Sequence, residues 1–212
     1  MPVEWLFIVS EEKVMLHDKD IREPLFDFLE ERYGKVRIIE EKQMGRSRAD
    51  VIMVRSGSLT GIEIKSDADS YARLARQVKD YDRYFDYNYV AVGSSHGNHI
   101  KEHVPEQWGI ITVEQAEYGL DFYVLREAVK NPSRSLRAKL GLLWRPELAH
   151  IQEIHQMPGY REKSKAFVID KILLKVPEEI LDDQISQELF ERDYTTIAEK
   201  IEVYRREKHR KI

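Results

Sequence analysis

The first half of the chain alternates between two spacings of apolar residues, one typical of helices and the other typical of strands. Over residues 18–34, apolar side chains recur every three or four positions, which predicts an amphipathic helix that ends at Gly34. A second stripe with this spacing runs through residues 66–87 and predicts another helix. Its apolar positions are Tyr71, Leu74, Val78, Tyr81 and Phe85.

Shorter runs of alternating or β-branched residues predict strands before and after the second helix. A strand is expected at 35–41, followed by the loop 42–48, and residues 48–65 are interpreted as two strands joined at a Ser/Gly turn. Two further strands are expected at 88–93 and 109–113, with a short helix between them. The predicted order is therefore helix, three strands, helix, strand, short helix and strand.

This order predicts an α/β (α+β) fold with a mixed central sheet, because helices interrupt the run of strands. From about residue 120 onward the pattern becomes mainly helical, with prolines separating four or five predicted helices. We therefore expect a core at residues 1–120 and a mainly α-helical C-terminal extension at residues 121–212.

The predicted hairpin carries charged side chains where a buried strand normally has hydrocarbon. If Val54 pairs with Leu59 across the turn, the antiparallel register continues to an opposed pair of acids, Asp50 and Glu63. Opposed residues share a face of the sheet, with Cβ atoms roughly 4.5–5.5 Å apart. Lys65 lies two positions after Glu63 and is expected on the same face.

Two carboxylates that face each other repel, unless a positive charge lies between them. Mg²⁺ prefers oxygen ligands and is commonly bound by one or two carboxylates with water and a phosphate oxygen. We therefore predict a cation site formed by Asp50, Glu63 and the backbone carbonyl of Ile64, with Mn²⁺ as a possible substitute. Lys65 would orient or deprotonate a water molecule. The alternative is a solvated strand face, since Glu-x-Lys is common in strands.

Asp50, followed after a hairpin by Glu63-Ile64-Lys65, resembles the PD-(D/E)xK nuclease superfamily, whose fold is called restriction-endonuclease-like. The αβββαβ core of that fold has the order predicted above, and Ala49 replaces the proline of the motif. The resemblance covers roughly residues 18–113, and the stretch is similar to poorly characterised bacterial and phage members. It implies a Mg²⁺-dependent deoxyribonuclease that hydrolyses phosphodiester bonds of DNA and leaves a 5′-phosphate and a 3′-hydroxyl.

The second predicted helix carries Gln77 and Tyr81, which resemble the Q-x-x-x-Y motif of exonuclease-type members of this superfamily. Residues four positions apart lie on one helix face, where they would bind DNA or brace the site; ordinary core packing is the alternative for Tyr81. Some branches of the superfamily supply an extra acid from the first helix or the preceding strand, and an ordinary exposed charge is the alternative for each candidate here. Glu41 is the preferred candidate, ahead of Glu30 and Glu40.

Basic residues are the candidates for contacts with phosphate. Arg48 and Arg22 would lie near the predicted site, and Arg134 and Arg137 belong to a basic stretch at residues 126–145. The basic side chains of that stretch are Arg126, Lys130, Arg134, Arg137, Lys139 and Arg145, and its acid is Glu127. A basic surface would track the phosphates of DNA. The alternative is a bundle of mixed charge, because acidic residues follow at 177–191.

Composition narrows the function classes further. The net charge of −4 argues against a uniformly basic surface, so any affinity for nucleic acid must come from local basic patches. The absence of cysteine excludes disulfides and thiolate metal sites. A reducing cytoplasm fits this composition, and no signal peptide or transmembrane helix is expected. His99 and His103 have a zinc-like spacing but lack further ligands. The rival to a nuclease is a catalytically silent nucleic-acid-binding or assembly module on the same fold, and a homodimer is possible.

Overall fold

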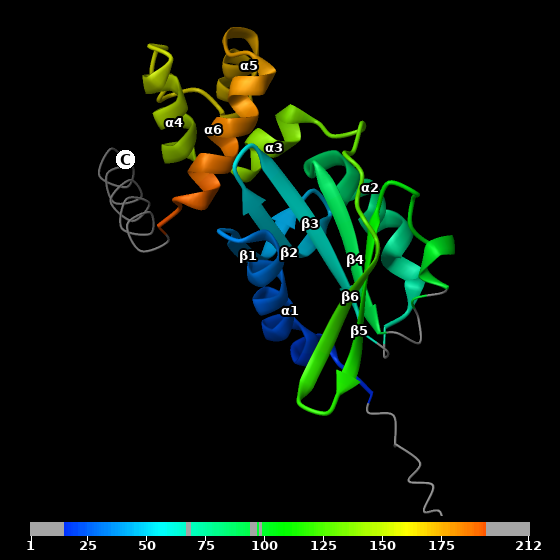
Figure 1. Cartoon of the computed structure of the whole chain (residues 1–212). Helices are drawn as coiled ribbons and strands as arrows, with labels where there is room; N and C mark the ends of the chain where they lie inside the picture. Colours follow the sequence, from blue (N-terminus) through cyan, green and yellow to red (C-terminus); the bar gives the residue numbers. More distant parts are fainter. Residues whose placement is uncertain (1–14, 67–68, 94–96, 98, 194–212) are drawn as a thin grey trace, which may run out of the picture.

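The computed structural model describes residues 15–66, 69–93, 97 and 99–193. Within them, six strands form one sheet in the order β1-β2-β3-β4-β5-β6 (Figure 1). β1, β2 and β3 are antiparallel, β3, β4 and β5 are parallel, and β6 is antiparallel to β5, so the sheet is mixed. The strands are β1 (Arg37–Met44), β2 (Ser47–Arg55), β3 (Ser58–Lys65), β4 (Tyr87–Gly93), β5 (Gly109–Ala116) and β6 (Gly119–Arg126).

Helices precede, interrupt and follow this sheet. They are α1 (Asp18–Tyr33), the 3₁₀ turn η1 (Tyr71–Arg73), α2 (Leu74–Tyr84), the 3₁₀ turn η2 (Ile100–Glu102), α3 (Leu136–Leu142), α4 (Arg145–Ile154), α5 (Lys165–Lys175) and α6 (Glu178–Phe190). The α/β class and the order of elements predicted up to residue 113 are confirmed. None of the described helices is both long and apolar enough to cross a lipid bilayer.

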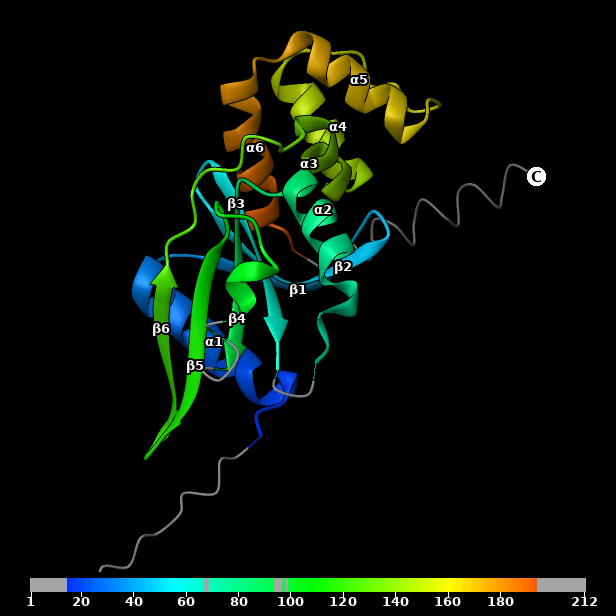
Figure 2. The ribbon, with the colours of Figure 1, turned by 90° about the vertical axis from the view of Figure 1, so that its right-hand side faces the viewer.

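The two faces of the sheet are covered by different helices. On one face, Ile21, Leu25 and Leu29 of α1 share a buried cluster with Ile62 and Ile64 of β3. On the other face, α2 and the C-terminal helices share a second buried cluster with the strands. Both views show α3, α4, α5 and α6 gathered at one end of the sheet, next to α2 (Figure 2).

The β2–β3 hairpin has the predicted register. Val54 pairs with Leu59, and the pairing continues from Arg55–Ser58 at the turn to Val51–Ile62. The turn is shorter than the predicted loop, because Arg55 and Ser58 already belong to the strands. Gly57 occupies this turn with φ of 70°, a left-handed conformation that glycine adopts without steric cost.

A glycine on β3 allows α2 to lie directly against the sheet. A Cβ atom built on Gly61 would come within 2.2 Å of the Phe85 ring and 2.7 Å of the Tyr81 ring. Both rings are fully buried. The absent side chain of Gly61 therefore fixes how closely the helix approaches the strand that carries Glu63 and Lys65.

Two predictions for individual segments are wrong. Most of the expected loop 42–48 is strand, because β1 and β2 meet in a tight turn at Gly45, whose φ is 56°. The stretch expected to be helical from about residue 120 begins with β6. Phe122 and Val124 pack against the α1 cluster, whereas Tyr123 is half-exposed between them. This period of two is that of a half-buried edge strand.

The chain is mainly helical from Leu136 onward, as expected. Ser135 and Ser164 cap α3 and α5 with side-chain oxygens that accept a backbone N–H. Leu148 of α4 and Leu181 of α6 lie in the same buried cluster as strand residues. The sheet continues to Arg126 at the end of β6, so the division at residue 120 stays a prediction.

Candidate functional site

A buried ion pair lies at the end of β3, beneath α2. The exposed fractions of Glu63 and Lys65 are 1% and 5%. Lys65 Nζ donates to Glu63 Oε1 at 2.6 Å and to Gln77 Oε1 at 3.2 Å, and the Gln77 amide donates to the same Glu63 oxygen. Because side chains alternate along a strand, Ile62 and Ile64 pack toward α1 on the opposite face. The predicted shared strand face of Glu63 and Lys65 is therefore formed, and Gln77 of α2 contacts both side chains.

The other oxygen of Glu63, Oε2, is buried and has no hydrogen-bond partner. Buried carboxylate oxygens are normally paired, so this atom has capacity for a ligand. Among the described residues, no group of three or more His, Cys, Asp or Glu side chains is placed to hold a metal ion. A cation here would therefore need backbone, water or substrate oxygens in addition to two carboxylates, which is usual for Mg²⁺.

Asp50 lies where β2 and β3 separate. The paired stretch ends at Val51–Ile62, and one step further the Ile64 N–H donates to Asp50 Oδ2 at 2.9 Å instead of to a backbone carbonyl. Burial, together with the negative charge of Glu63, raises the pKa of Asp50 to about 7. The carboxylate thus retains part of its proton near neutral pH, and a bound cation would favour its ionised form.

Tyr81 connects α2 to both strands of the hairpin. Its hydroxyl donates to the Ile62 carbonyl at 3.2 Å and accepts the Asp50 N–H at 3.2 Å. The side chain is fully buried, and its ring contacts Trp108 with centroids 5.4 Å apart. Burial, with the charges of Glu63 and Asp50, raises the pKa of Tyr81 well above its usual value. Tyr81 is thus a phenol donor that braces the site.

Arg22 reaches the site from α1. Its Nη1 donates to the Asp50 carbonyl at 3.2 Å, and its Nη2 lies 3.9 Å from Asp50 Oδ1. Asp18, one helical turn earlier, pairs with Arg22 at 2.9 Å, and its charge adds to the rise in the pKa of Asp50. The sequence analysis did not place Asp18 near the site. Its spacing of four from Arg22 is the signal that could have placed it beside the site.

Glu41 and Arg48 lie at the exposed rim. Arg48 Nη1 is 3.1 Å from Glu41 Oε2, and both side chains are half-exposed. Glu41 Oε1 is 3.9 Å from Arg22 Nη2, whereas Glu40 lies 3.4 Å from Arg22 Nη1. Glu41, the preferred candidate for the extra acid, thus forms ion pairs at the rim. It does not form a three-acid cluster with Asp50 and Glu63. Glu30 is exposed on α1.

Comparison with known proteins assigns a family. The sequence profile described as bacteriophage P4 protein cII matches residues 10–208. The chain belongs to this family. No curated protein matches it. A solved structure, that of Pyrococcus furiosus SfsA in complex with Ca²⁺, is similar at 15% identity over 56% of this chain and 67% of that chain, with a TM-score of 0.35. A similarity at this level carries no functional argument, so the resemblance to PD-(D/E)xK nucleases stays a prediction.

The structure does not bring Arg134 and Arg137 to the site. Arg134 is 10% exposed, and its Nε lies 2.9 Å from Asp86 Oδ1. The other oxygen of Asp86 accepts the N–H of Leu59 at the start of β3, whereas Glu63 lies near the end of that strand. Arg137 forms an exposed ion pair with an aspartate of α5, Asp170. Both side chains are engaged with carboxylates, so the alternative of a mixed-charge bundle describes them better.

The histidines do not form the helical pair that their spacing suggested. η2 is a single short turn, and His103 packs its ring on Tyr71 with centroids 4.4 Å apart. His99 precedes this turn. The basic segment at 205–212 lies outside the described residues.

Proposed function

We propose that the chain is a metal-dependent nuclease that hydrolyses phosphodiester bonds of DNA. The observation that supports this proposal is that Asp50 accepts the N–H of Ile64, the residue between the ion-paired Glu63 and Lys65, while one buried oxygen of Glu63 is left unpaired. A merely structural ion pair has no need for a second carboxylate whose pKa is raised to about 7. Mg²⁺ is the expected cation, and Mn²⁺ is a possible substitute.

In this proposal, Asp50 and Glu63 hold the cation, and the Ile64 carbonyl is a further candidate ligand. The residues fit such an ion because carboxylate oxygens are its preferred protein ligands and Glu63 Oε2 has no other partner. When bound, a divalent cation polarises the phosphate and makes a coordinated water more acidic. Arg22, beside Asp50, balances negative charge that a phosphate would add.

Lys65 Nζ, which is charged while it donates to Glu63, is the group that orients the attacking water, and it can accept the proton of that water only in its neutral form. Gln77 positions both partners of the ion pair, since its amide donates to Glu63 and its carbonyl oxygen accepts from Lys65. Tyr81 positions the backbone of Asp50 and of Ile62. Arg48 is half-exposed at the rim and is the candidate for a contact with a substrate phosphate.

The test is cleavage of supercoiled, linear and single-stranded DNA, with RNA alongside, in Mg²⁺, in Mn²⁺ and in EDTA. We expect cation-dependent cleavage by the wild-type chain and a loss of at least about a hundredfold in Glu63→Gln. Glu114→Gln is the matched control, because Glu114 is an exposed strand acid on β5. A purified, folded wild-type chain that cleaves no form of nucleic acid with either cation would refute the proposal.

Cation binding has a separate readout. Mn²⁺ should raise the melting temperature of the wild-type chain and of Glu114→Gln, and it should leave that of Glu63→Gln unchanged. An equal rise in all three proteins would place the cation elsewhere.

The second candidate function is a catalytically silent nucleic-acid-binding or assembly module. The observation that favours it is that Lys65 already supplies a positive charge 2.6 Å from Glu63, where a cation would compete. DNA binding that is unaffected by EDTA and by Glu63→Gln, without cleavage, would support this candidate.

A further inference from the structure

A cluster of cations lies between the edge strand β1 and the C-terminal helices. Lys42 of β1 places its Nζ 5.2 Å from the centre of the Trp144 ring, which belongs to the turn between α3 and α4. Arg192, after α6, has its Cζ 4.4 Å from the centre of the same ring. Burial and the positive charges of Arg192 and Lys165 lower the pKa of Lys42 to about 8, although Glu147 opposes this effect. Three cations therefore share this region with one carboxylate.

That carboxylate is occupied by Arg192. The guanidinium of Arg192 donates to both oxygens of Glu147, at 2.6 and 2.7 Å, and both side chains are buried. Lys42 has neither a hydrogen bond nor an ion pair with any described residue. Lys165 Nζ donates to a neutral group, the carbonyl of Gly141, at 2.7 Å. The two lysines of the cluster thus have no carboxylate bound to them.

Two cations of the cluster begin helices. Arg145 is the first residue of α4, and Lys165 is the first residue of α5. The N-terminal end of a helix carries partial positive charge, so it attracts anions and repels cations. Burial, with Arg192 and Arg145, lowers the pKa of Lys165 although Glu147 opposes it. Arg145 Nη2 donates to two backbone carbonyls, each at 3.3 Å. An anion bound here would relieve the repulsion among these cations.

The cation cluster lies beside the candidate nuclease site. Lys42 pairs with Ala49 across β1 and β2, and Asp50 is the next residue of β2. Neighbouring strands of a sheet lie about 4.8 Å apart. Lys42 contacts the turn between α3 and α4, and Glu63 contacts α2, so both side chains lie on the sheet face that these helices cover. The first cation of the cluster is therefore one strand away from Asp50.

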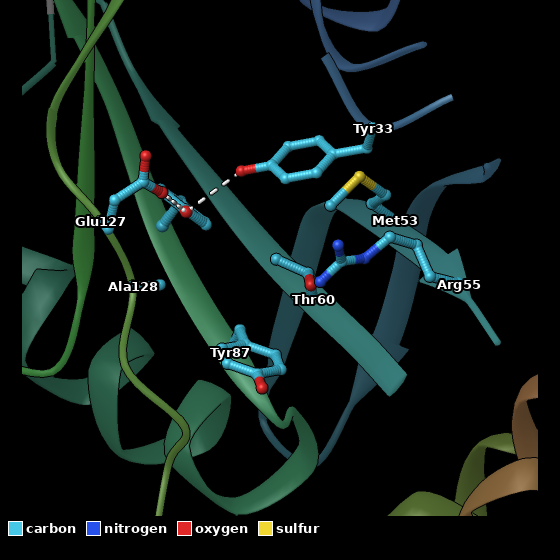
Figure 3. Close-up of a pocket in the computed structure, with 8 residues that line it drawn as sticks. Tyr33, Met53, Arg55, Thr60, Tyr87, Glu127 and Ala128 are labelled. Atoms are coloured by element: carbon cyan, nitrogen blue, oxygen red, sulfur yellow. Dashed lines mark hydrogen bonds between the residues drawn. The ribbon is translucent and has the colours of Figure 1, made fainter. Parts of the chain in front are cut away.

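The cavity of about 180 Å³ on the α1 face of the sheet shows no such excess of one charge (Figure 3). Its wall contains one cation, Arg55, and one carboxylate, Glu127. Glu127 is exposed and forms an ion pair with Arg32. The unpaired atoms of Arg55 and Thr60 have no accessible surface. This cavity indicates no particular ligand, whereas the cation cluster favours an anion.

We propose that Lys42, Lys165 and Arg145 bind a phosphate group of a nucleic-acid strand. The choice of nucleic acid over another polyanion rests on the proposed nuclease function, because the cluster lies one strand from Asp50. A nucleic-acid strand carries regularly spaced phosphates, so a strand with one phosphate at Asp50 places further phosphates beside Lys42. Lysine binds phosphate as a compact point charge. Such a contact positions the strand and reads no base.

The experiment is fluorescence anisotropy with a labelled oligothymidine and the full chain in EDTA, which prevents metal-dependent cleavage. Lys42→Gln and Lys165→Gln should each weaken binding about threefold or more at low salt. Each should also reduce the slope of log affinity against log salt concentration by about 0.7, the value for one phosphate of a single strand. Lys42→Arg keeps the charge and should retain both affinity and slope.

The matched control is Lys175→Gln. Lys175 is an exposed lysine at the opposite end of α5, about 15 Å along the helix axis from Lys165. Its loss removes the same charge from the same helix, so unchanged binding by Lys175→Gln shows that the effect belongs to the cluster and not to net charge. A loss equal to that of Lys165→Gln would overturn the proposal.

The outcomes also separate this proposal from the nuclease proposal and from rival ligands. Weaker binding and a smaller slope in Lys42→Gln and Lys165→Gln support it whether or not the chain cleaves DNA. Wild-type affinity and slope in both variants would overturn it, even with cleavage in Mg²⁺ intact, and so would the absence of wild-type binding. Inorganic phosphate or an oligoglutamate peptide that binds as tightly as the oligothymidine, at equal concentration of charge, would also overturn the assignment to a nucleic-acid strand.

Discussion

Within the described part of the chain, two buried lysines contact carboxylates, and the surroundings of Lys65 differ from those of Lys139. Lys139 of α3 is fully buried, and its Nζ donates to both oxygens of Asp86 and to Asp182 at 2.5–3.0 Å. Arg134 pairs with the same two acids and with the exposed Glu178, so each charge of this network has an opposite partner. Neither acid has a buried oxygen without a partner among the described residues. This balanced network joins α3 and α6 to the start of β3.

Around Lys65 the charges are not balanced in this way. Lys65 pairs with Glu63, but a second carboxylate, Asp50, lies nearby, and burial together with the charge of Glu63 raises the pKa of Asp50. In addition, Glu63 Oε2 has no partner. Buried charge stabilises a fold when its partners are complete, and it costs stability when they are not. The comparison distinguishes the structural ion network around Lys139 from the residues around Lys65, whose charges are not fully paired and could bind a further ligand.

The largest expected effect is on the balanced network. Asp86→Asn should lower the free energy of unfolding by about 3–5 kcal/mol, because Lys139 and Arg134 lose a shared buried carboxylate. Urea unfolding measures this change, with Asp121→Asn on the exposed face of β6 as the matched control. A loss below about 1 kcal/mol would mean that the network does not hold the helices to the sheet.

The same kind of substitution at the candidate site should have the opposite sign. Asp50→Asn should raise the free energy of unfolding by about 1–3 kcal/mol at pH 8 in EDTA, because it removes a carboxylate whose ionised form is disfavoured by burial and by Glu63. It should also abolish the stabilisation by Mn²⁺. Destabilisation by Asp50→Asn would remove the contrast between the two regions.

That gain should depend on pH. The pKa of Asp50 is about 7 in the folded chain, against 3.8 for an ordinary aspartate. Between these values the folded state binds more protons than the unfolded state, so wild-type stability falls as pH rises through the window. The difference between Asp50→Asn and wild type should therefore be near zero below pH 4, grow through the window and level off above pH 7. Unfolding curves across this range measure it, and a constant difference would argue against titration of Asp50.

A smaller effect is expected at Gln77. Gln77→Leu removes the amide that contacts both Glu63 and Lys65, and it should cost about 1 kcal/mol of stability. If Gln77 positions the pair, kcat for cleavage should fall about tenfold with little change in KM. Gln187→Leu, at an exposed position of α6, is the control. A change in stability without a change in kcat would indicate a purely structural role.

The smallest effect is expected at Arg137. Its ion pair with Asp170 is about half-exposed, so Arg137→Ala should change stability by less than about 1 kcal/mol and leave DNA affinity unchanged. Arg48→Ala at the rim should weaken DNA binding in the same fluorescence-anisotropy assay. If both variants weaken DNA binding equally, the hypothesis of a DNA-binding basic surface around Arg137 would be supported after all.

Local patterns predicted much of the fold. The order of elements up to residue 113 follows from apolar spacing, and the hairpin register follows from one short turn. β6 was missed, although Phe122 and Val124 alternate with exposed positions, because helical signals further along the chain dominated the interpretation. Arg134 was assigned to DNA because sequence alone does not show which acids fold back onto it.

By itself, the sequence determined that Glu63 and Lys65 share a strand face, because side chains alternate along a strand. It also determined that Asp50 lies on the opposite strand of the hairpin, because the length of the turn sets the register. Tertiary structure decided the rest. Gln77 reaches the ion pair because Gly61 lets α2 lie against β3, and Arg134 is neutralised by carboxylates distant in sequence. Such contacts depend on how separate elements pack together, and no local pattern along the chain records that packing.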